Sequence, residues 1–133
     1  MYRNYLLISY PNLEVDVIIN LWRKFHFIAE ILCNGNDKRD LLKKAAHEID
    51  TIDPVYMKGR NIPQKYIEQV CRIKEMLSLP QNVCILKNVP VSSFVIQNLT
   101  EEEADNLVRM IFELESNLNP NNFLGNSHLH ILE

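Results

Sequence analysis

Apolar residues that recur at steps of three and four are the feature that most limits what this chain can fold into. They are clearest between residues 15 and 32, where they comprise Val15, Ile18, Ile19, Trp22, Phe25, Ile28, Ile31 and Leu32. Such steps place side chains on one face of an α-helix, which has about 3.6 residues per turn. Pro11 suits the first turn of this helix, and Asn34-Gly35-Asn36 ends it. The sequence therefore predicts a long helix that begins near residue 11.

The same spacing predicts three more helices, over residues 37–49, 63–77 and 100–118. The last of them opens with Thr100-Glu101-Glu102-Glu103, a sequence typical of a capping box. In that motif the threonine hydroxyl and the glutamate carboxylate each accept a backbone N–H of the first turn. The acidic cluster also favours the positive end of the helix dipole, so we interpret it as structural and not as a metal site.

Short apolar runs predict a minor β component. Val83-Cys84-Ile85-Leu86 is too short for a helix and rich in β-branched residues, which is typical of a buried strand. Residues 93–96 predict a weaker extended piece, and residues 128–131 alternate polar with apolar side chains as a strand does. We therefore expect an α+β fold that is mostly helical, with about four helices packed on a small sheet of one to three short strands.

Length and charge limit the classes of protein to consider. The 133 residues, 47% of them hydrophobic, predict one domain over 1–133. The apolar strand predicted near residue 130 favours the interpretation that this domain is the N-terminal portion of a larger one. A net charge of −3 argues against nucleic-acid binding, which needs many Lys and Arg contacts to phosphate. No window reaches the roughly 18 apolar residues of a membrane span, so we expect no membrane partner.

The cysteines and the N-terminus predict a cytoplasmic protein. Cys33, Cys71 and Cys84 form no CxxC pair and each lies among apolar residues, so we expect buried free thiols in a reducing compartment. The apolar run before Pro11 is too short for the core of a signal peptide.

Two groups of residues are candidate sites, and neither is a complete catalytic motif. His128 and His130 lie two apart, so on a strand both would face the same way and could bind one metal ion, although a third ligand would be needed. The alternative is that they are ordinary strand histidines. Trp22, Phe25 and Phe27 make the first helix rich in aromatic residues, and any part left exposed would mark a protein interface.

One stretch carries a resemblance to a known family. It reads Asn82-Val83-Cys84-Ile85-Leu86-Lys87-Asn88-Val89-Pro90-Val91, and it is followed by the helix that opens at Thr100 and by Phe123-Leu124-Gly125. With the preceding helix, residues 70–133 resemble the N-terminal region of the clavaminate synthase-like iron(II)/2-oxoglutarate dioxygenases, which include hydroxylases of arginine or asparagine. In that family this region precedes the catalytic barrel.

The catalytic residues of that family have no counterpart here. The family binds iron through a His-x-Asp/Glu pair and a distant second histidine, and it binds 2-oxoglutarate through an arginine. His128-Leu129-His130 does not fit that pair, and neither His nor Arg follows it. We therefore assign no catalytic residue and expect no cofactor for this chain alone. Iron(II) and 2-oxoglutarate would bind only if the site is completed elsewhere.

Two functions of different class follow. The first is a non-catalytic helical N-terminal portion, or a degenerate relative, of an iron(II)/2-oxoglutarate-dependent oxygenase; it predicts an exposed apolar terminal strand. The second is a small helical protein–protein interaction module, either a homodimer or a bacterial or viral protein that binds a partner through residues 13–32. It predicts a self-contained core and exposed aromatic residues on that helix.

Overall fold

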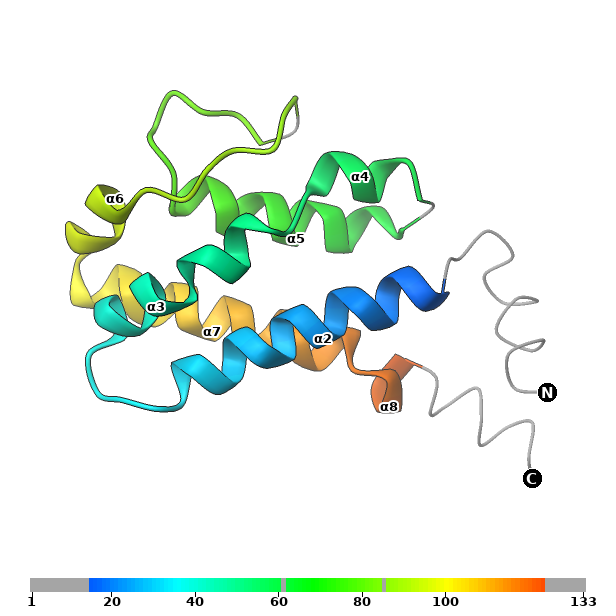
Figure 1. The fold of residues 1–133 in the computed structure, drawn as a ribbon, viewed down its shortest axis with the longest axis horizontal. Coiled ribbons are helices and arrows are strands. Elements are labelled where there is room, and N and C mark those ends of the chain that lie inside the picture. Colours follow the sequence, from blue (N-terminus) through cyan, green and yellow to red (C-terminus); the bar gives the residue numbers. More distant parts are fainter. Residues whose placement is uncertain (1–14, 61, 85, 124–133) are drawn as a thin grey trace.

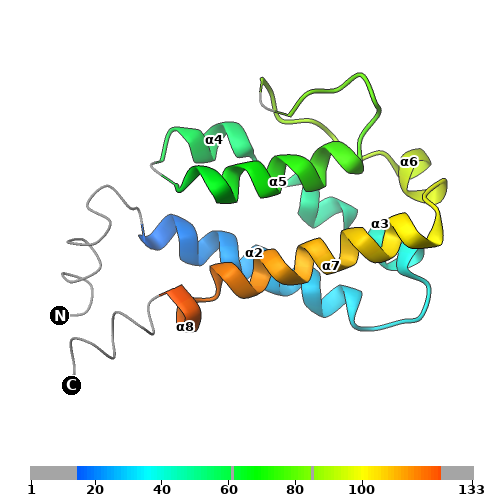
Figure 2. The same ribbon diagram turned by 180° about the vertical axis from the view of Figure 1, so that it is seen from behind.

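The computed structural model describes residues 15–60, 62–84 and 86–123. The helices in these ranges are α2 (Val15–Leu32), α3 (Lys38–Asp50), α4 (Pro54–Lys58), α5 (Gln64–Met76), α6 (Ser93–Gln97), α7 (Glu101–Leu118) and α8 (Pro120–Phe123). Helices α2 and α7 lie side by side and run in opposite directions, as Figures 1 and 2 show from the two sides. Helix α3 contacts both of them, α5 contacts α7, and α4 contacts α5.

One apolar core joins the long helices, because each presents a stripe of apolar side chains to its neighbours. The largest of the fully buried residues come from all four of them: Phe25, Ile28, Leu42, Ile49, Ile73, Leu107, Ile111 and Leu114. Burial of each such side chain contributes about 1.5–3 kcal/mol relative to exposure. The helical stripe predicted from the sequence is confirmed for most of its members, since Ile18, Phe25, Ile28 and Leu32 lie in this core and Trp22 and Ile31 pack against it.

The predicted capping box at the start of α7 is also confirmed. The N–H of Glu103 donates to the hydroxyl of Thr100 at 3.0 Å, and the N–H of Thr100 donates to the carboxylate of Glu103 at 2.8 Å. These bonds satisfy two of the N–H groups that a helix start leaves without an intrahelical acceptor. The acidic residues of this turn thus have the structural role expected of them.

The α+β prediction is wrong, since the part of the chain that the structure describes contains helices and no strand or sheet. A run such as 83–86 forms a strand only if a neighbouring strand satisfies its backbone, whereas the described residues of this run, 83, 84 and 86, lie in a loop. Residues 93–96 belong to α6, which Ser92 caps by accepting the N–H of Val95 at 3.3 Å. The strand predicted over residues 128–131 lies outside the described residues.

Two smaller features differ from what the sequence predicts. Between the predicted helices over 37–49 and 63–77 the structure has the short helix α4, in which Asp53 accepts the N–H of Val55 at 2.9 Å and Pro54 fills the first turn. Cys71 and Cys84 are buried free thiols as predicted, but Cys33 is exposed because it lies just beyond the end of α2.

No helix among the described residues is long and apolar enough to cross a lipid bilayer.

Candidate protein interaction surface

The connection between α5 and α6 is a closed loop over residues 77–92, which we call the interaction loop. The N–H of Ser92 donates to the carbonyl of Leu77 at 2.8 Å, so the two ends of the loop meet. In both views the loop lies beyond α5, on the side away from α2 and α7 (Figures 1 and 2). A compact loop with closed ends is an Ω-loop, a structure that often carries function. Residues 77–84 form its outgoing leg and residues 86–92 its return leg.

Side chains from two helices hold the inner face of the interaction loop. The carboxylate of Glu75, on α5, accepts the N–H of Cys84 at 2.9 Å. The carboxylate of Asp50, on α3, accepts the N–H of Val91 at 2.7 Å. Leu77 and Cys84 on the outgoing leg are both 0% exposed and Val89 on the return leg is 1% exposed, so both legs place apolar side chains in the core. The loop is therefore fixed on the inside by hydrogen bonds and by apolar burial together.

Lys74, on α5, makes the third polar contact with the loop, and it is itself 1% exposed. Its ammonium donates to the carbonyl of Ile52 at 2.6 Å and to the side-chain oxygen of Asn88 on the return leg. Burial lowers the pKa of Lys74, and the carboxylates of Asp50 and Asp53 act against that shift.

Exposed apolar side chains lie along the interaction loop and at the start of α6 (Ser93–Gln97), which follows it. Leu86 is 81% exposed and Val83 48%, both near the tip. Leu79 and Phe94 are 40% and 71% exposed, and they follow Leu77 and Ser92, the residues that close the loop, by two positions each. We call Leu79, Val83, Leu86 and Phe94 the interaction surface. Exposed apolar residues are ordinary when scattered singly, so it is the occurrence of four of them within residues 79–94 that makes this region a candidate contact site.

The segment that carries the interaction surface is also almost without charge. Residues 76–100 contain a single charged residue, Lys87, although 23% of the whole chain is charged. Depletion of charged residues is what distinguishes the centre of a protein–protein interface from other protein surface. This signal was present in the sequence, but the interpretation of residues 83–86 as a buried strand concealed it.

The aromatic residues predicted as an interface on α2 do not form one surface. Phe25 is 1% exposed and belongs to the core, whereas Phe27 is 50% exposed. Trp22 is partly buried, and its indole N–H donates to the carboxylate of Glu115 at 3.0 Å. Its ring stacks on that of His26 at 4.8 Å between centroids. Of the predicted three, Phe27 is thus the one that points to solvent.

His26 joins a network of side chains between α2 and α7. Its Nδ1 atom lies 3.2 Å from the carboxylate of Glu115 on α7, and its Nε2 atom lies 3.3 Å from the carboxylate of Glu30 on α2. Within residues 15–60, 62–84 and 86–123, no group of three or more His, Cys, Asp or Glu side chains is placed to bind a metal ion. The predicted metal ligands His128 and His130 lie outside the described residues.

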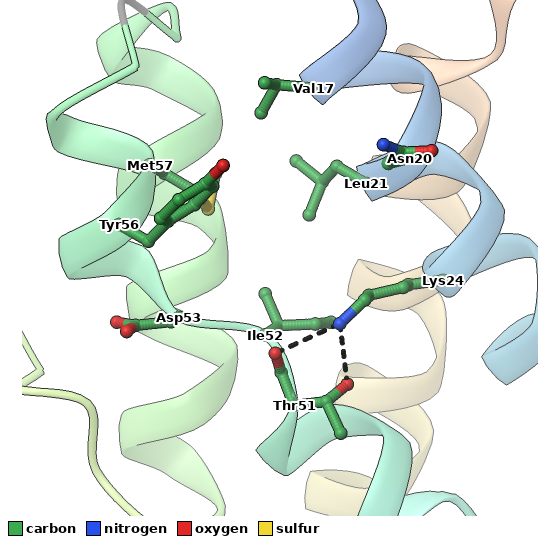
Figure 3. A pocket seen from close by; sticks show the side chains of 9 residues that line it. All are labelled: Val17, Asn20, Leu21, Lys24, Thr51, Ile52, Asp53, Tyr56 and Met57. Atoms are coloured by element: carbon green, nitrogen blue, oxygen red, sulfur yellow. Dashed lines mark hydrogen bonds between the residues drawn. The ribbon is translucent and has the colours of Figure 1, made fainter.

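A second candidate is the groove between α2 and the start of α4, with a volume of about 330 Å³ (Figure 3). Its apolar wall includes Leu21, Ile52 and Met57. Its cation, Lys24, donates to the carbonyl of Thr51 at 3.1 Å and to its hydroxyl at 3.0 Å. A lysine there neutralises the negative end of α3, so its position has a structural explanation.

Neither a protein-family model nor a curated protein nor a solved structure matches this chain.

Proposed function

We propose that this chain is a helical protein–protein interaction module that binds a partner protein through the interaction surface. The observation that carries the proposal is the group of exposed apolar side chains in the interaction loop and at the start of α6, on a segment with one charged residue in 25. Burying a leucine or phenylalanine side chain at such a contact is worth about 1.5–3 kcal/mol. Leu86 and Phe94, the two most exposed apolar residues of the surface, are therefore the expected anchors.

The loop is suited to this role because its inner face is fixed before any partner arrives. Binding is weakened by the entropy of ordering side chains and loops at the interface. The carboxylates of Glu75 and Asp50 accept two backbone N–H groups of the loop, and Lys74 donates to the side chain of Asn88, so less of the loop has to be ordered when a partner binds. Lys87, next to Leu86, is the single charge of the segment, and it fits a partner with an apolar surface bordered by a carboxylate.

Site-specific photo-crosslinking tests this proposal. We would place a benzoylphenylalanine at position 86 or 94 of the full chain, irradiate cells that make the protein, and identify the products by mass spectrometry. The matched control carries the same group at Phe27, an exposed aromatic position on α2. We expect one defined protein, or a second copy of this chain, to be crosslinked from 86 and 94 and not from 27.

Two variants define what would contradict the proposal. Leu86→Ser and Phe94→Ser should each weaken association with the crosslinked protein by about tenfold or more, which corresponds to 1.4 kcal/mol. Phe27→Ser should not weaken it. The proposal fails if Leu86→Ser and Phe94→Ser bind as the unaltered chain does. It also fails if the surface binds vesicles of phosphatidylcholine and phosphatidylserine in a cosedimentation assay and crosslinks to no protein.

The dioxygenase resemblance stays a separate prediction. The stretch that carries it, residues 82–91, lies in the interaction loop, and the segment with His128 and His130 lies outside the described residues. Calorimetric titration of the chain with iron(II) and with 2-oxoglutarate tests it. Tight binding of either ligand would identify an oxygenase site, whereas an N-terminal portion without a catalytic centre would bind neither.

A further inference from the structure

Lys74 is the least expected residue in the core of this protein. It is 1% exposed and lies on α5, where the buried thiols of Cys71 and Cys84 and the carboxylates of Asp50 and Asp53 all interact electrostatically with it. A lysine is almost never fully buried unless it is paired. The two oxygens that accept its hydrogen bonds belong to a backbone carbonyl and an amide, so its direct partners are uncharged.

Holding an ammonium there is unfavourable for folding. Desolvation of a buried charge opposes the folded state, and burial accordingly lowers the pKa of Lys74. An apolar side chain of similar size usually supports a core as well or better than a buried charge does. The stability of the core therefore does not explain why a lysine occupies this position.

The contacts of Lys74 join three segments that are distant in sequence. The lysine lies on α5, Ile52 lies in the connection between α3 and α4, and Asn88 lies on the return leg of the interaction loop. Asn88 follows Lys87 directly and lies two residues after Leu86, at the tip of the loop. A lysine side chain is long enough to reach across this gap and can direct several N–H donors to different acceptors.

We propose that Lys74 is a positioning residue, which fastens the return leg of the interaction loop so that Leu86 is displayed to a partner. This inference rests on the proposed function, because it names what controls the same surface. Without the ammonium, the amide of Asn88 turns to water, since Asn88 is already exposed. The return leg then keeps Val89 and the Asp50–Val91 hydrogen bond, and loses the contact closest to the tip.

Trypsin provides a direct test, because Lys87 is the one Lys or Arg between Lys74 and Arg109. Cleavage of the Lys87–Asn88 bond requires the return leg to leave its position. We would compare Lys74→Met, Asn88→Ala and the control Lys44→Met, an exposed lysine on α3. The Lys58–Gly59 bond, at the exposed end of α4, serves as the internal reference. Lys74→Met and Asn88→Ala should each be cut at Lys87 about tenfold faster than the unaltered chain, and Lys44→Met should not.

Urea unfolding separates positioning from ordinary core support. We expect Lys74→Met to keep or raise the urea midpoint while its loop is cut faster, a combination that a purely structural lysine would not give. The double variant should be cut no faster than either single variant, because both remove the same contact. If Lys74→Met does not fold, the cleavage rate of Asn88→Ala alone tests the inference. Asn88 is exposed, so we expect this variant to fold.

Two results would overturn the inference. One is an unchanged ratio of Lys87 to Lys58 cleavage in both variants. The other is a fall in the urea midpoint of Lys74→Met with both bonds cut faster to the same extent, which would make Lys74 a core residue only. Neither measurement involves a partner, so the two proposals can fail separately. Unchanged binding by Leu86→Ser and Phe94→Ser would contradict the proposed function alone, and an unchanged cleavage ratio would contradict the positioning role alone.

Discussion

At the scale of single residues, the two buried groups next to the interaction loop should respond to alkaline pH in opposite directions. Burial, together with a hydrogen bond to Cys71, raises the pKa of the Cys84 thiol from 9.0 to about 12. Its folded-state pKa exceeds the unfolded value, so its contribution to stability is complete below pH 9.0 and is lost as the pH rises toward about 12. Burial lowers the pKa of Lys74 from 10.5. The free-energy cost of burying its charge therefore diminishes as the pH rises toward 10.5.

A Cys84→Ala variant isolates the first effect. Its free energy of unfolding should fall less between about pH 8 and pH 10 than that of the unaltered chain, because the unfolded state no longer gains a thiolate. Urea unfolding at the two pH values measures this difference, with Cys33→Ala, which alters an exposed thiol, as the control. Identical pH dependence of the unaltered chain and Cys84→Ala would contradict the assignment of a buried, protonated thiol at this position.

At the scale of elements, the start of α7 makes the sharpest prediction. Thr100→Ala removes the hydroxyl that accepts the N–H of Glu103, and it should lower the free energy of unfolding by about 1 kcal/mol. Asn117→Ala, an exposed change near the other end of α7, should change it by less than about 0.5 kcal/mol. Urea titrations monitored by circular dichroism measure both. Equal effects of the two changes would show that the capping box does not stabilise the helix.

The elements also show how far sequence reasoning reached. The capping box at Thr100 depends on residues three apart, and an apolar stripe on residues within a few turns, so both are readable from local sequence. The segment 83–86 is different, because a short apolar run becomes a strand or a loop according to what lies beside it. Here Glu75 and Asp50 accept the backbone N–H groups of Cys84 and Val91. Local sequence patterns do not predict contacts between residues that far apart in the chain.

The candidate site was predictable in part, and for the same reason. The scarcity of charge between residues 76 and 100 is visible in the sequence, whereas the exposure of Leu86 and the burial of Lys74 depend on tertiary structure. Lys74 occupies a position where the helical stripe of α5 would accept an apolar residue. Local rules treat any lysine as exposed, so they miss a lysine whose acceptors, Ile52 and Asn88, come from other segments.

At the scale of the whole molecule, Phe25 and Phe27 show how one core decides what each aromatic residue can do. They lie two apart on α2, so they point to different sides of the helix, and they are 1% and 50% exposed. Phe25→Ala should lower the free energy of unfolding by about 3–5 kcal/mol, because it leaves a cavity in the core that α2, α3, α5 and α7 share. Phe27→Ala should lower it by less than about 1 kcal/mol.

Because a domain of this size is stabilised by only about 5–15 kcal/mol, the Phe25 change removes a large share of the total. The loss should appear as one cooperative transition at lower urea, seen alike by circular dichroism and by Trp22 fluorescence, since α2 and α7 enclose the same core. Two separate transitions would mean that the helices do not fold around one core. A loss for Phe27→Ala as large as that for Phe25→Ala would place Phe27 inside, and would remove it as a control for the interaction surface.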